Sequence, residues 1–398
     1  MENTTEPNWV GIREHFMLAP DEVYLNAGTF SALPRSVYDE LVNLIAQSEA
    51  NPTRVAAANS RLPLWASQRE MAGYFNADPK DIIFHVNVTQ ALNQALFGLE
   101  WPREGELLVS DQEYGAIVYA ALEMARRRGL TVRSFALPLQ PKSSEELCNA
   151  VEAALSDKTV GVLLSHITSS TGIVVPIEAI AKMLRQRGIC FIVDGAHGPG
   201  LLPLDLEATQ VDIYAGNLHK WFMGPKGTAF LYVTRSLHNT MQPSCVGWGS
   251  VLTDNEPIHD EYSGNDYRFQ YVFRTQGLRD VSPFLALPAT IRFRREIGEE
   301  NIRRRIEELV AYARTRLTSD AGLQCVSPPG AMNAGLVCFR APHEWCDAEA
   351  NERLYQQHRI TVAIFEMPDV GVIIRVSPHI WNNFDDIDRL VAALSTSV

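Results

Sequence analysis

The sequence lacks the features that mark a membrane protein, a secreted protein or a nucleic-acid-binding protein. No apolar run approaches the ~18 residues that a helix needs to cross a bilayer, and the N-terminus has neither the basic start nor the apolar stretch of a secretory signal. Positive charge is scarce, since 35 lysines and arginines stand against 47 aspartates and glutamates, for a formal net charge of −12. A nucleic acid requires a basic surface. We therefore expect no nucleic-acid partner, no membrane partner and a cytoplasmic protein.

Cysteine is also scarce, and its spacing excludes common metal and disulfide patterns. The six cysteines are scattered and form no C-x-x-C pair, which indicates reduced thiols and no zinc site. Walker A and H-E-x-x-H motifs are absent, and the glycines at 195, 198 and 200 are not in the dinucleotide-binding order G-x-G-x-x-G. We therefore expect no metal.

The length of 398 residues is enough for two domains. From about residue 60 to 235, short apolar runs alternate with helical patterns, which predicts a mainly parallel sheet covered on both faces in an α/β domain. The predicted strands are 82–86, 107–110, 160–164, 190–193, 212–215 and 229–233, with helices at 116–128 and 177–187.

After about residue 283 the pattern changes to an α+β unit. Two long helical patterns, 283–297 and 300–318, precede short apolar runs and a last helix near 384–394. We expect an N-terminal segment, 1–30, that packs on the smaller domain, a large domain at 31–282 and a small domain at 283–398. The polar stretch 250–275 is expected to be a long loop.

Polar residues follow five of the predicted strands. These ends begin at Asn87, Ser110, Ser165, Asp194 and Asn217. In open parallel sheets the carboxyl ends of the strands line the ligand crevice, so we expect these side chains to meet in one site.

An aldehyde cofactor that draws electrons from a substrate needs four kinds of group. It needs a lysine amine to form an imine, and a carboxylate to keep its ring nitrogen protonated. It also needs a helix N-terminus for its phosphate and a flat side chain to stack on its ring. The sequence offers a group for each of these needs, in the order given: Lys220, Asp194, the helix start at Val88 and Thr89, and Tyr114. This set indicates pyridoxal 5′-phosphate.

The motif Asp194-Gly195-Ala196-His197 is followed by His219-Lys220, so that the lysine lies 26 residues after the aspartate (220−194). This pattern resembles the class V aminotransferase group of fold-type I pyridoxal-phosphate enzymes. The segments 24–30, 224–227 and 278–284 resemble the isopenicillin N epimerase-like branch of that group. The resemblance covers nearly the whole chain. It implies a large domain with a mainly parallel, seven-stranded-type sheet, a smaller C-terminal α+β domain, and a homodimer with the site at the subunit boundary.

The resemblance also implies a role for each matching residue. The groups expected to act in catalysis are Lys220 as the Schiff-base lysine and proton shuttle, Asp194 at the pyridine nitrogen, His197 near the ring oxygen and Tyr114 as the stacking aromatic. The other groups expected to bind the cofactor are Ala196 under the ring, Ser169 near the ring oxygen, and Val88, Thr89, Asn217 and His219 at the phosphate. The substrate carboxylate is expected to bind Arg375, together with Asn26, because a guanidinium binds a carboxylate through two parallel hydrogen bonds.

Three positions depart from the family pattern. Leu218 replaces a usual glycine before the histidine and lysine, and Lys226 replaces a common threonine. Leu278 replaces a threonine that commonly donates to the cofactor phosphate of the neighbouring subunit, and a leucine side chain has no donor.

The reaction stays open at this stage among several chemistries of a small amino-acid substrate. Loss of the α-proton to Lys220 gives a quinonoid carbanion, and epimerisation then needs a second acid, for which Tyr114 and Cys245 are the candidates. β-Elimination, such as carbon–sulfur lysis of a cysteine derivative, needs only a leaving group on Cβ. Transamination has no specific support. Desulfuration needs a thiol on the loop before Arg375, and residues 363–368 contain none. The intact set of Asp194, His197 and Lys220 argues against a non-catalytic relative.

Overall fold

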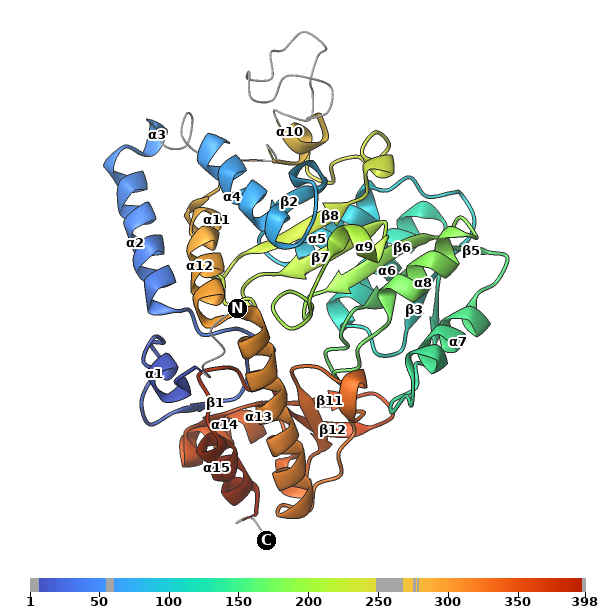
Figure 1. Ribbon diagram of the computed structural model, residues 1–398. Helices are drawn as coiled ribbons and strands as arrows, with labels where there is room; N and C mark the ends of the chain where they lie inside the picture. Colours follow the sequence, from blue (N-terminus) through green and yellow to red (C-terminus); the bar gives the residue numbers. More distant parts are fainter. Residues whose placement is uncertain (1–6, 55–60, 248–267, 275–276, 278, 396–398) are drawn as a thin grey trace, which may run out of the picture.

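The computed structural model describes residues 7–54, 61–247, 268–274, 277 and 279–395. Its largest element is a seven-stranded sheet (Figure 1) with the spatial order β2 (Ile82–His85), β8 (Ala229–Val233), β7 (Ile213–Asn217), β6 (Cys190–Gly195), β5 (Thr159–Ser165), β3 (Glu106–Ser110) and β4 (Thr131–Phe135). The strands from β7 to β4 are parallel, whereas β8 is antiparallel to both β7 and β2. The predicted α/β fold with a mainly parallel sheet is confirmed.

Helices cover both faces of this sheet. Leu107 and Val109 of β3 point into a hydrophobic core formed with α5 (Val88–Gly98) and α6 (Gly115–Arg128). Leu108, which lies between them, belongs to the core of the opposite face, together with α4 (Arg61–Tyr74), α7 (Ser144–Ala154) and α8 (Ile177–Arg185). Successive residues of a strand point to opposite faces, so a strand covered on both sides has to be apolar throughout.

The strands predicted from apolar runs are all present, and two details of this region differ. β4 was not predicted, because it is an edge strand whose residues are half-buried or exposed and therefore form no apolar run. α8 ends at Arg185 and not at Arg187. Gly188, at φ +65°, lies in the turn that leads to β6.

The C-terminal part of the chain has its own hydrophobic core. It contains an antiparallel sheet and three helices: β11 (Ala363–Met367), β12 (Gly371–Val376), β9 (Val337–Arg340), α13 (Glu299–Ser319), α14 (Ala350–His358) and α15 (Phe384–Ser395). The interpretation of residues 363–368 as a loop was wrong, because residues 363–367 form β11, which pairs with the strand that carries Arg375.

The N-terminal segment packs against this second core. β1 (Val23–Tyr24) pairs in parallel with β10 (Ile360–Thr361), and Phe16 and Leu25 are buried among the C-terminal side chains. The helical pattern at 283–297 is divided into α11 (Ser282–Leu285) and α12 (Leu287–Ile297), with a proline in the first turn of each. The boundaries 1–30, 31–282 and 283–398 stay a prediction. The remaining helices are α1 (Trp9–Arg13), α2 (Arg35–Ala50), α3 (Pro52–Arg54) and α9 (Leu206–Thr209).

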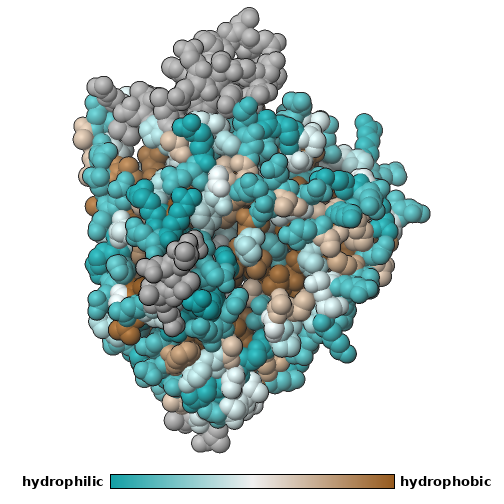
Figure 2. All heavy atoms as spheres, viewed as in Figure 1, coloured by the Kyte–Doolittle hydropathy of each residue, from teal (hydrophilic) through white to brown (hydrophobic). Residues whose placement is uncertain are grey.

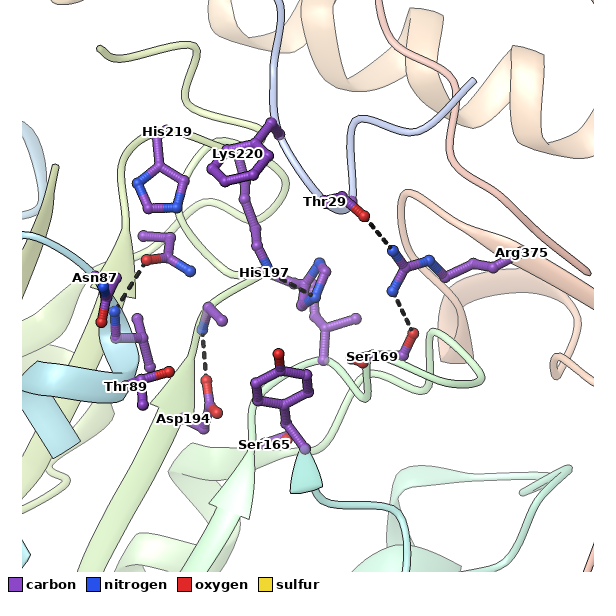
Figure 3. Close-up of a pocket in the computed structure, with 17 residues that line it drawn as sticks. Thr29, Asn87, Thr89, Ser165, Ser169, Asp194, His197, His219, Lys220 and Arg375 are labelled. Carbon is purple, nitrogen blue, oxygen red and sulfur yellow. Dashed lines mark hydrogen bonds between the residues drawn. The ribbon is translucent and has the colours of Figure 1, made fainter. Parts of the chain in front are cut away.

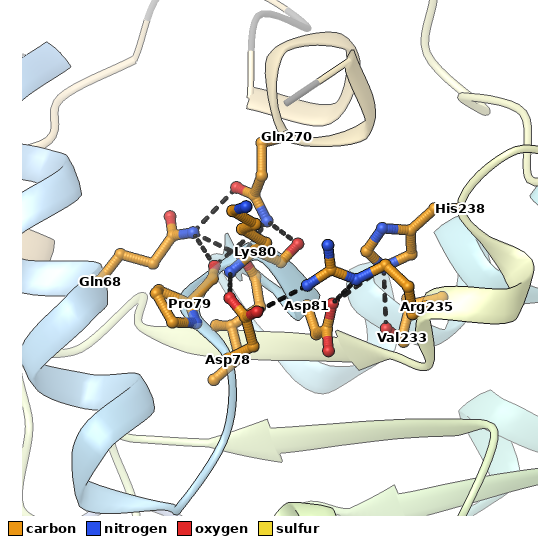
Figure 4. A network of polar contacts seen from close by, with 10 residues as sticks. Gln68, Asp78, Pro79, Lys80, Asp81, Val233, Arg235, His238 and Gln270 are labelled. Atoms are coloured by element: carbon orange, nitrogen blue, oxygen red, sulfur yellow. Dashed lines mark hydrogen bonds and ion pairs between the residues drawn. The ribbon is translucent and has the colours of Figure 1, made fainter. Parts of the chain in front are cut away.

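A polar network attaches α10 (Arg268–Arg274) to the edge of the large sheet (Figure 4). Gln270 Nε2 donates to the carbonyls of Lys80 at 2.7 Å and Ile82 at 2.6 Å, and Gln68 Nε2 donates to Gln270 Oε1 at 2.8 Å. The expected loop at 250–275 was therefore wrong for residues 268–274, which are helical. Residues 250–267, 275 and the departure at Leu278 lie outside the described residues.

The surface is mostly hydrophilic on the face that Figure 2 shows, where hydrophobic residues occur in small separate groups. Among the described residues, no helix combines the length and the apolar character that crossing a bilayer requires.

Candidate active site

A cavity of about 310 Å³ lies where the polar strand ends meet (Figure 3). Because β2 runs parallel to β7, the ends of β2, β3, β5, β6 and β7 share this edge of the sheet. The residues that line the cavity are Gly28, Thr29, Phe30, Asn87, Val88, Thr89, Tyr114, Ser165, Ile167, Ser169, Asp194, Ala196, His197, Asn217, His219, Lys220 and Arg375. The structure thus brings together every predicted site residue except Asn26, whose Oδ1 lies 3.4 Å from Arg375 Nη2.

The amine of Lys220 lies in the cavity beside the ring of His197. The loop after β7 carries Lys220, whose Nζ is 3.2 Å from His197 Nε2. Burial and, second to it, the nearby cation of Arg375 lower the pKa of Lys220 to about 7, against the opposing charge of Asp194. Burial also holds the pKa of His197 well below its usual range. Near neutral pH this lysine is therefore a nucleophile and a base, and the histidine is uncharged.

Asp194 is the last residue but one of β6 and is 3% exposed. Its Oδ1 accepts a hydrogen bond from the backbone N–H of Ala196 at 2.9 Å, while burial raises the pKa of the carboxyl group. The next residue has to be glycine, because a Cβ at Gly195 would lie 2.1 Å from the ring of Tyr214. A buried carboxylate in this position is stabilised by a cationic partner such as a protonated ring nitrogen.

A second acid lies behind the site. Glu113 accepts hydrogen bonds from the hydroxyls of Ser110 and Ser165, each at 2.6 Å. Burial raises the pKa of Glu113 to about 7, and the neighbouring charge of Asp194 contributes to the increase. Ser165 was expected at the site as a strand-end residue but without a role, and it lines the cavity. Glu113 was not predicted, although it lies in the segment that follows β3.

The start of α5 offers donors for an anion. Asn87 caps the helix by accepting the Gln90 N–H at 2.8 Å, while the Val88 N–H donates to Asn217 Oδ1 at 3.0 Å. Because the Val88 N–H is engaged, the N–H and hydroxyl of Thr89 are the donors that this helix end offers to a phosphate. Lys226 does not line the cavity. Its Nζ donates to the carbonyl of Ser31 at 2.7 Å.

His219 lies beside this helix end and packs against Phe30, with ring centroids 5.3 Å apart and ring planes tilted by 40°. Its Nδ1 is buried and has no hydrogen-bond partner among the described residues. Burial lowers the pKa of His219 to about 4, so the ring is neutral. A neutral histidine with an unsatisfied ring nitrogen fits a ligand that supplies the missing hydrogen bond.

Arg375 reaches the cavity from β12, and its side chain is almost fully buried. Nη1 donates to the carbonyl of Ser169 at 3.0 Å, and Nη2 donates to the hydroxyl of Thr29 at 3.0 Å. Gly28 leaves room beside the guanidinium, because a Cβ there would lie 3.4 Å from Arg375 Cζ and Nη2. Arg375 Nε is buried without a partner in the part of the chain that the structure describes. This guanidinium therefore retains donors for a carboxylate.

Several lining residues could not be recognised from the sequence as part of the site. Gly28, Thr29 and Phe30 reach the cavity because the backbone N–H of Ala27 pairs with the carbonyl of Ser377, next to β12. Ile167 is an ordinary buried apolar residue by type. No pattern in the sequence indicates such a pairing between segments about 350 residues apart.

The cavity fits the groups of pyridoxal phosphate by its own chemistry. It offers the amine of Lys220 with its lowered pKa, the buried carboxylate of Asp194, donors at the start of α5 and His219 Nδ1, which no described residue engages. If the cofactor binds here, Lys220 would hold the aldehyde, Asp194 the ring nitrogen, and Thr89 and His219 the phosphate. Among the described residues, no three His, Cys, Asp or Glu side chains are placed to hold a metal ion.

Comparisons with known proteins identify the family. The family model of aminotransferase class V matches residues 23–390. The isopenicillin N epimerase of Amycolatopsis lactamdurans is 36% identical over 393 residues, covering 97% of this chain and 98% of that protein. The isopenicillin N epimerase of Streptomyces clavuligerus is 33% identical over 390 residues, with 97% and 98% covered.

Among solved structures, a mutant of the enzyme C-DES with glycine covalently linked to its pyridoxal-phosphate cofactor has a TM-score of 0.82 and 28% identity, covering 96% of this chain and 98% of that chain. The complex of the cystine C–S lyase C-DES with its product cysteine persulfide has a TM-score of 0.81 and the same identity, covering 94% and 98%. The protein is a pyridoxal-phosphate enzyme of fold type I, and it belongs to the class V aminotransferase family.

Proposed function

We propose that this enzyme epimerises the α-carbon of a small amino acid or amino-acid-derived substrate, in the manner of isopenicillin N epimerase. The observation that carries this choice is the identity of 36% and 33% with two isopenicillin N epimerases along nearly the whole chain. A carbon–sulfur lyase such as the hercynylcysteine sulfoxide lyase of Schizosaccharomyces pombe is 26% identical over 80% of the chain.

The basic side chains of the cavity suit an amino-acid substrate. Arg375 would bind the substrate carboxylate, because its buried guanidinium keeps donors that no described residue uses. Lys220, with a pKa of about 7, would take the α-proton as a neutral amine. When bound, pyridoxal phosphate withdraws electrons from the α-carbon and so makes its C–H bond acidic.

Inversion requires a proton from the face opposite Lys220. Tyr114 lines the cavity at the start of α6, and its side chain is 53% exposed, which gives it access to water for proton exchange. Tyr114 lies close enough to Arg375 that its ionised form would raise the pKa of that guanidinium, so the hydroxyl lies near the proposed carboxylate site. Cys245, the other candidate, is exposed and does not line this cavity. We propose Tyr114 as the second acid.

The test is to incubate the holoenzyme with single enantiomers of amino acids and of amino-acid-containing peptides in deuterium oxide. Epimerisation predicts deuterium at Cα and formation of the opposite configuration, and Tyr114→Phe should slow inversion about 100-fold or more while exchange without inversion persists. Release of pyruvate or a thiol without any inversion would refute the proposal.

β-Elimination is the second candidate. The observation that favours it is the likeness to C-DES along nearly the whole chain, with a TM-score of 0.82. A lyase needs Lys220 and Arg375 but no second acid, so Tyr114→Phe would leave pyruvate release from cystine nearly unchanged. Desulfuration through an enzyme persulfide has no support from β11, since Ala363–Met367 contains no cysteine.

We also propose that two copies of the chain form a homodimer. Val37 attaches α2 to the body of the protein, while Tyr38, Val42 and Ile45 on another face are 42%, 45% and 41% exposed. A spacing of four and three residues places these three side chains on one side of the helix, and an apolar stripe of this kind favours a second subunit. Light scattering should give twice the chain mass, and a monomer that keeps full activity would contradict the proposal.

A further inference from the structure

A chain of four hydrogen bonds runs from the C-terminal core to the amine of Lys220. The backbone N–H of Ile380 donates to His379 Nδ1 at 2.8 Å, and His379 Nε2 lies 3.1 Å from the carbonyl oxygen of Trp221. The indole Nε1 of Trp221 donates to His197 Nδ1 at 3.0 Å, and His197 Nε2 lies 3.2 Å from Lys220 Nζ.

The direction of every bond in this chain is determined by its chemistry. Backbone N–H and indole N–H groups only donate, and a carbonyl oxygen only accepts. His379 and His197 each receive a donor at Nδ1, so in the neutral ring the proton sits on Nε2. Both rings are neutral, because burial lowers the pKa of His379 to about 3 and that of His197 well below its usual range.

His197 therefore presents an N–H to Lys220. A lysine ammonium has three donors and no acceptor, so its contact with this N–H would place two donors face to face. The free amine has a lone pair that accepts the hydrogen bond. The contact at 3.2 Å is thus satisfied only when the lysine carries no charge.

We propose that Trp221 is a positioning residue that fixes the tautomer of His197 and thereby holds Lys220 as a free amine. The free amine is the form that adds to a carbonyl and accepts a proton. This inference rests on Lys220 being the reactive amine of the proposed function, and it holds for an epimerase and for a lyase alike.

Trp221 is held so that its N–H cannot turn away. The residue is fully buried, and its carbonyl also accepts from Arg294 Nη1 at 2.9 Å. The His379 ring stacks on its indole at 5.9 Å between centroids, and the Trp381 ring stacks on His379 at 4.5 Å. These contacts come from α12 and from the segment after β12, so the C-terminal core sets the orientation of the indole.

Two changes at position 221 test the role of the indole N–H. Trp221→Phe removes it, and incorporation of 3-benzothienylalanine replaces the N–H by sulfur while keeping the size and the stacking. The matched control is Trp101→Phe, because Trp101 Nε1 also donates one hydrogen bond, to the carbonyl of Leu96 at 2.8 Å, and Trp101 does not line the cavity. All variants are made in the full chain, and the cofactor is removed before measurement.

The first readout is the ¹⁵N spectrum of ring-labelled histidine, with His197 assigned by comparison with His197→Gln. The unchanged chain should show an unprotonated Nδ1 and a protonated Nε2 for His197 at pH 7. Both changes at position 221 should give a mixture of the two tautomers, whereas Trp101→Phe should not. A protonated Nδ1 or a charged ring in the unchanged chain would overturn the proposal.

The second readout is the pH dependence of Lys220 acylation by an amine-reactive reagent, followed on the Lys220 peptide by mass spectrometry. Loss of the N–H should raise the apparent pKa of the amine by about one unit, which lowers its reactivity at pH 6 about tenfold. An equal pKa in the 3-benzothienylalanine protein and in Trp101→Phe would refute the role of Trp221. Because this readout needs neither cofactor nor turnover, it fails independently of the proposed reaction.

Discussion

Replacing Lys220 by methionine should stabilise the cofactor-free protein. Methionine is similar in length to lysine and carries no charge. The environment of Lys220 disfavours its cationic form, since burial and the cation of Arg375 both lower its pKa, from 10.5 to about 7. A difference of about 3.5 pKa units corresponds to a destabilisation of at most about 5 kcal/mol when the lysine is charged in both the folded and unfolded states.

The sign of the effect follows from proton binding. Between pH 7 and 10.5 the unfolded chain keeps the proton on Lys220 while the folded chain has released it, so this group makes the stability rise with pH. Below pH 7 its destabilising contribution is complete, and above pH 10.5 it is absent. The stability that Lys220→Met gains at pH 7 should therefore exceed its gain at pH 9.5 by about 3 kcal/mol.

The assay is urea unfolding of the cofactor-free chains, followed by tryptophan fluorescence at the two pH values. Lys182→Met on α8 is the matched control, because this lysine is exposed and its replacement relieves no buried charge. A variant that is no more stable than the unchanged chain at pH 7 would refute the reasoning. So would a gain of equal size at both pH values, which would indicate better packing and no effect of charge.

Three further changes test other parts of the site. Arg375→Lys should raise KM for the amino acid by roughly 10- to 150-fold with cofactor content unchanged, because a lysine cannot replace two charge-assisted hydrogen bonds; an unchanged KM would exclude Arg375 as the carboxylate site. Gly195→Ala should lower the free energy of unfolding by about 1–3 kcal/mol or more, since its Cβ would lie 2.1 Å from the ring of Tyr214. In thermal unfolding, the same change should cost less in a chain that already carries Tyr214→Ala than in the unchanged chain. Burial raises the pKa of Glu113 to about 7, so the folded chain binds more protons than the unfolded chain between pH 4.5 and 7 and loses stability as pH rises through this range. Glu113→Gln should reduce that loss, measured as the change in Tm between pH 5 and pH 8, and an unchanged difference would contradict the pKa shift.

The strands and the strand-end residues were predictable because a strand that is buried on both faces appears in the sequence as a continuous apolar run. The six residues Cys190–Gly195 of β6 are almost all buried. The apolar run that leads to Asp194 therefore predicts both the strand and a carboxylate at its end. β4 contains no such apolar run, because its residues are half-buried or exposed. Propensity and periodicity report burial, so they detect the buried edge strand β2 but fail at β4, the edge strand that is not buried.

The parts of the site that were not predicted depend on contacts between distant segments. Thr29 contacts Arg375 because the N-terminal segment pairs beside β12. Trp221 directly follows Lys220 in the sequence, yet its importance lies in the direction of its N–H toward His197, which no residue pattern records. A motif identifies the types of residue in a site, but tautomers and hydrogen-bond directions follow only from the packed arrangement.

The charges of the cavity also connect substrate binding to the strength of the base. Arg375 is the second cause of the lowered pKa of Lys220, after burial. A carboxylate bound to Arg375 would cancel much of that cation's field at Lys220, so the pKa of the amine should rise when the substrate binds. The lysine is then uncharged and nucleophilic before the substrate arrives, and it becomes a stronger base once the carboxylate is in place. An uncharged carboxamide analogue of the substrate has no charge to cancel that of Arg375, so it should bind without raising the pKa of Lys220. Its α-proton should therefore be lost more slowly even when the analogue saturates the enzyme, a condition that removes the effect of weaker binding.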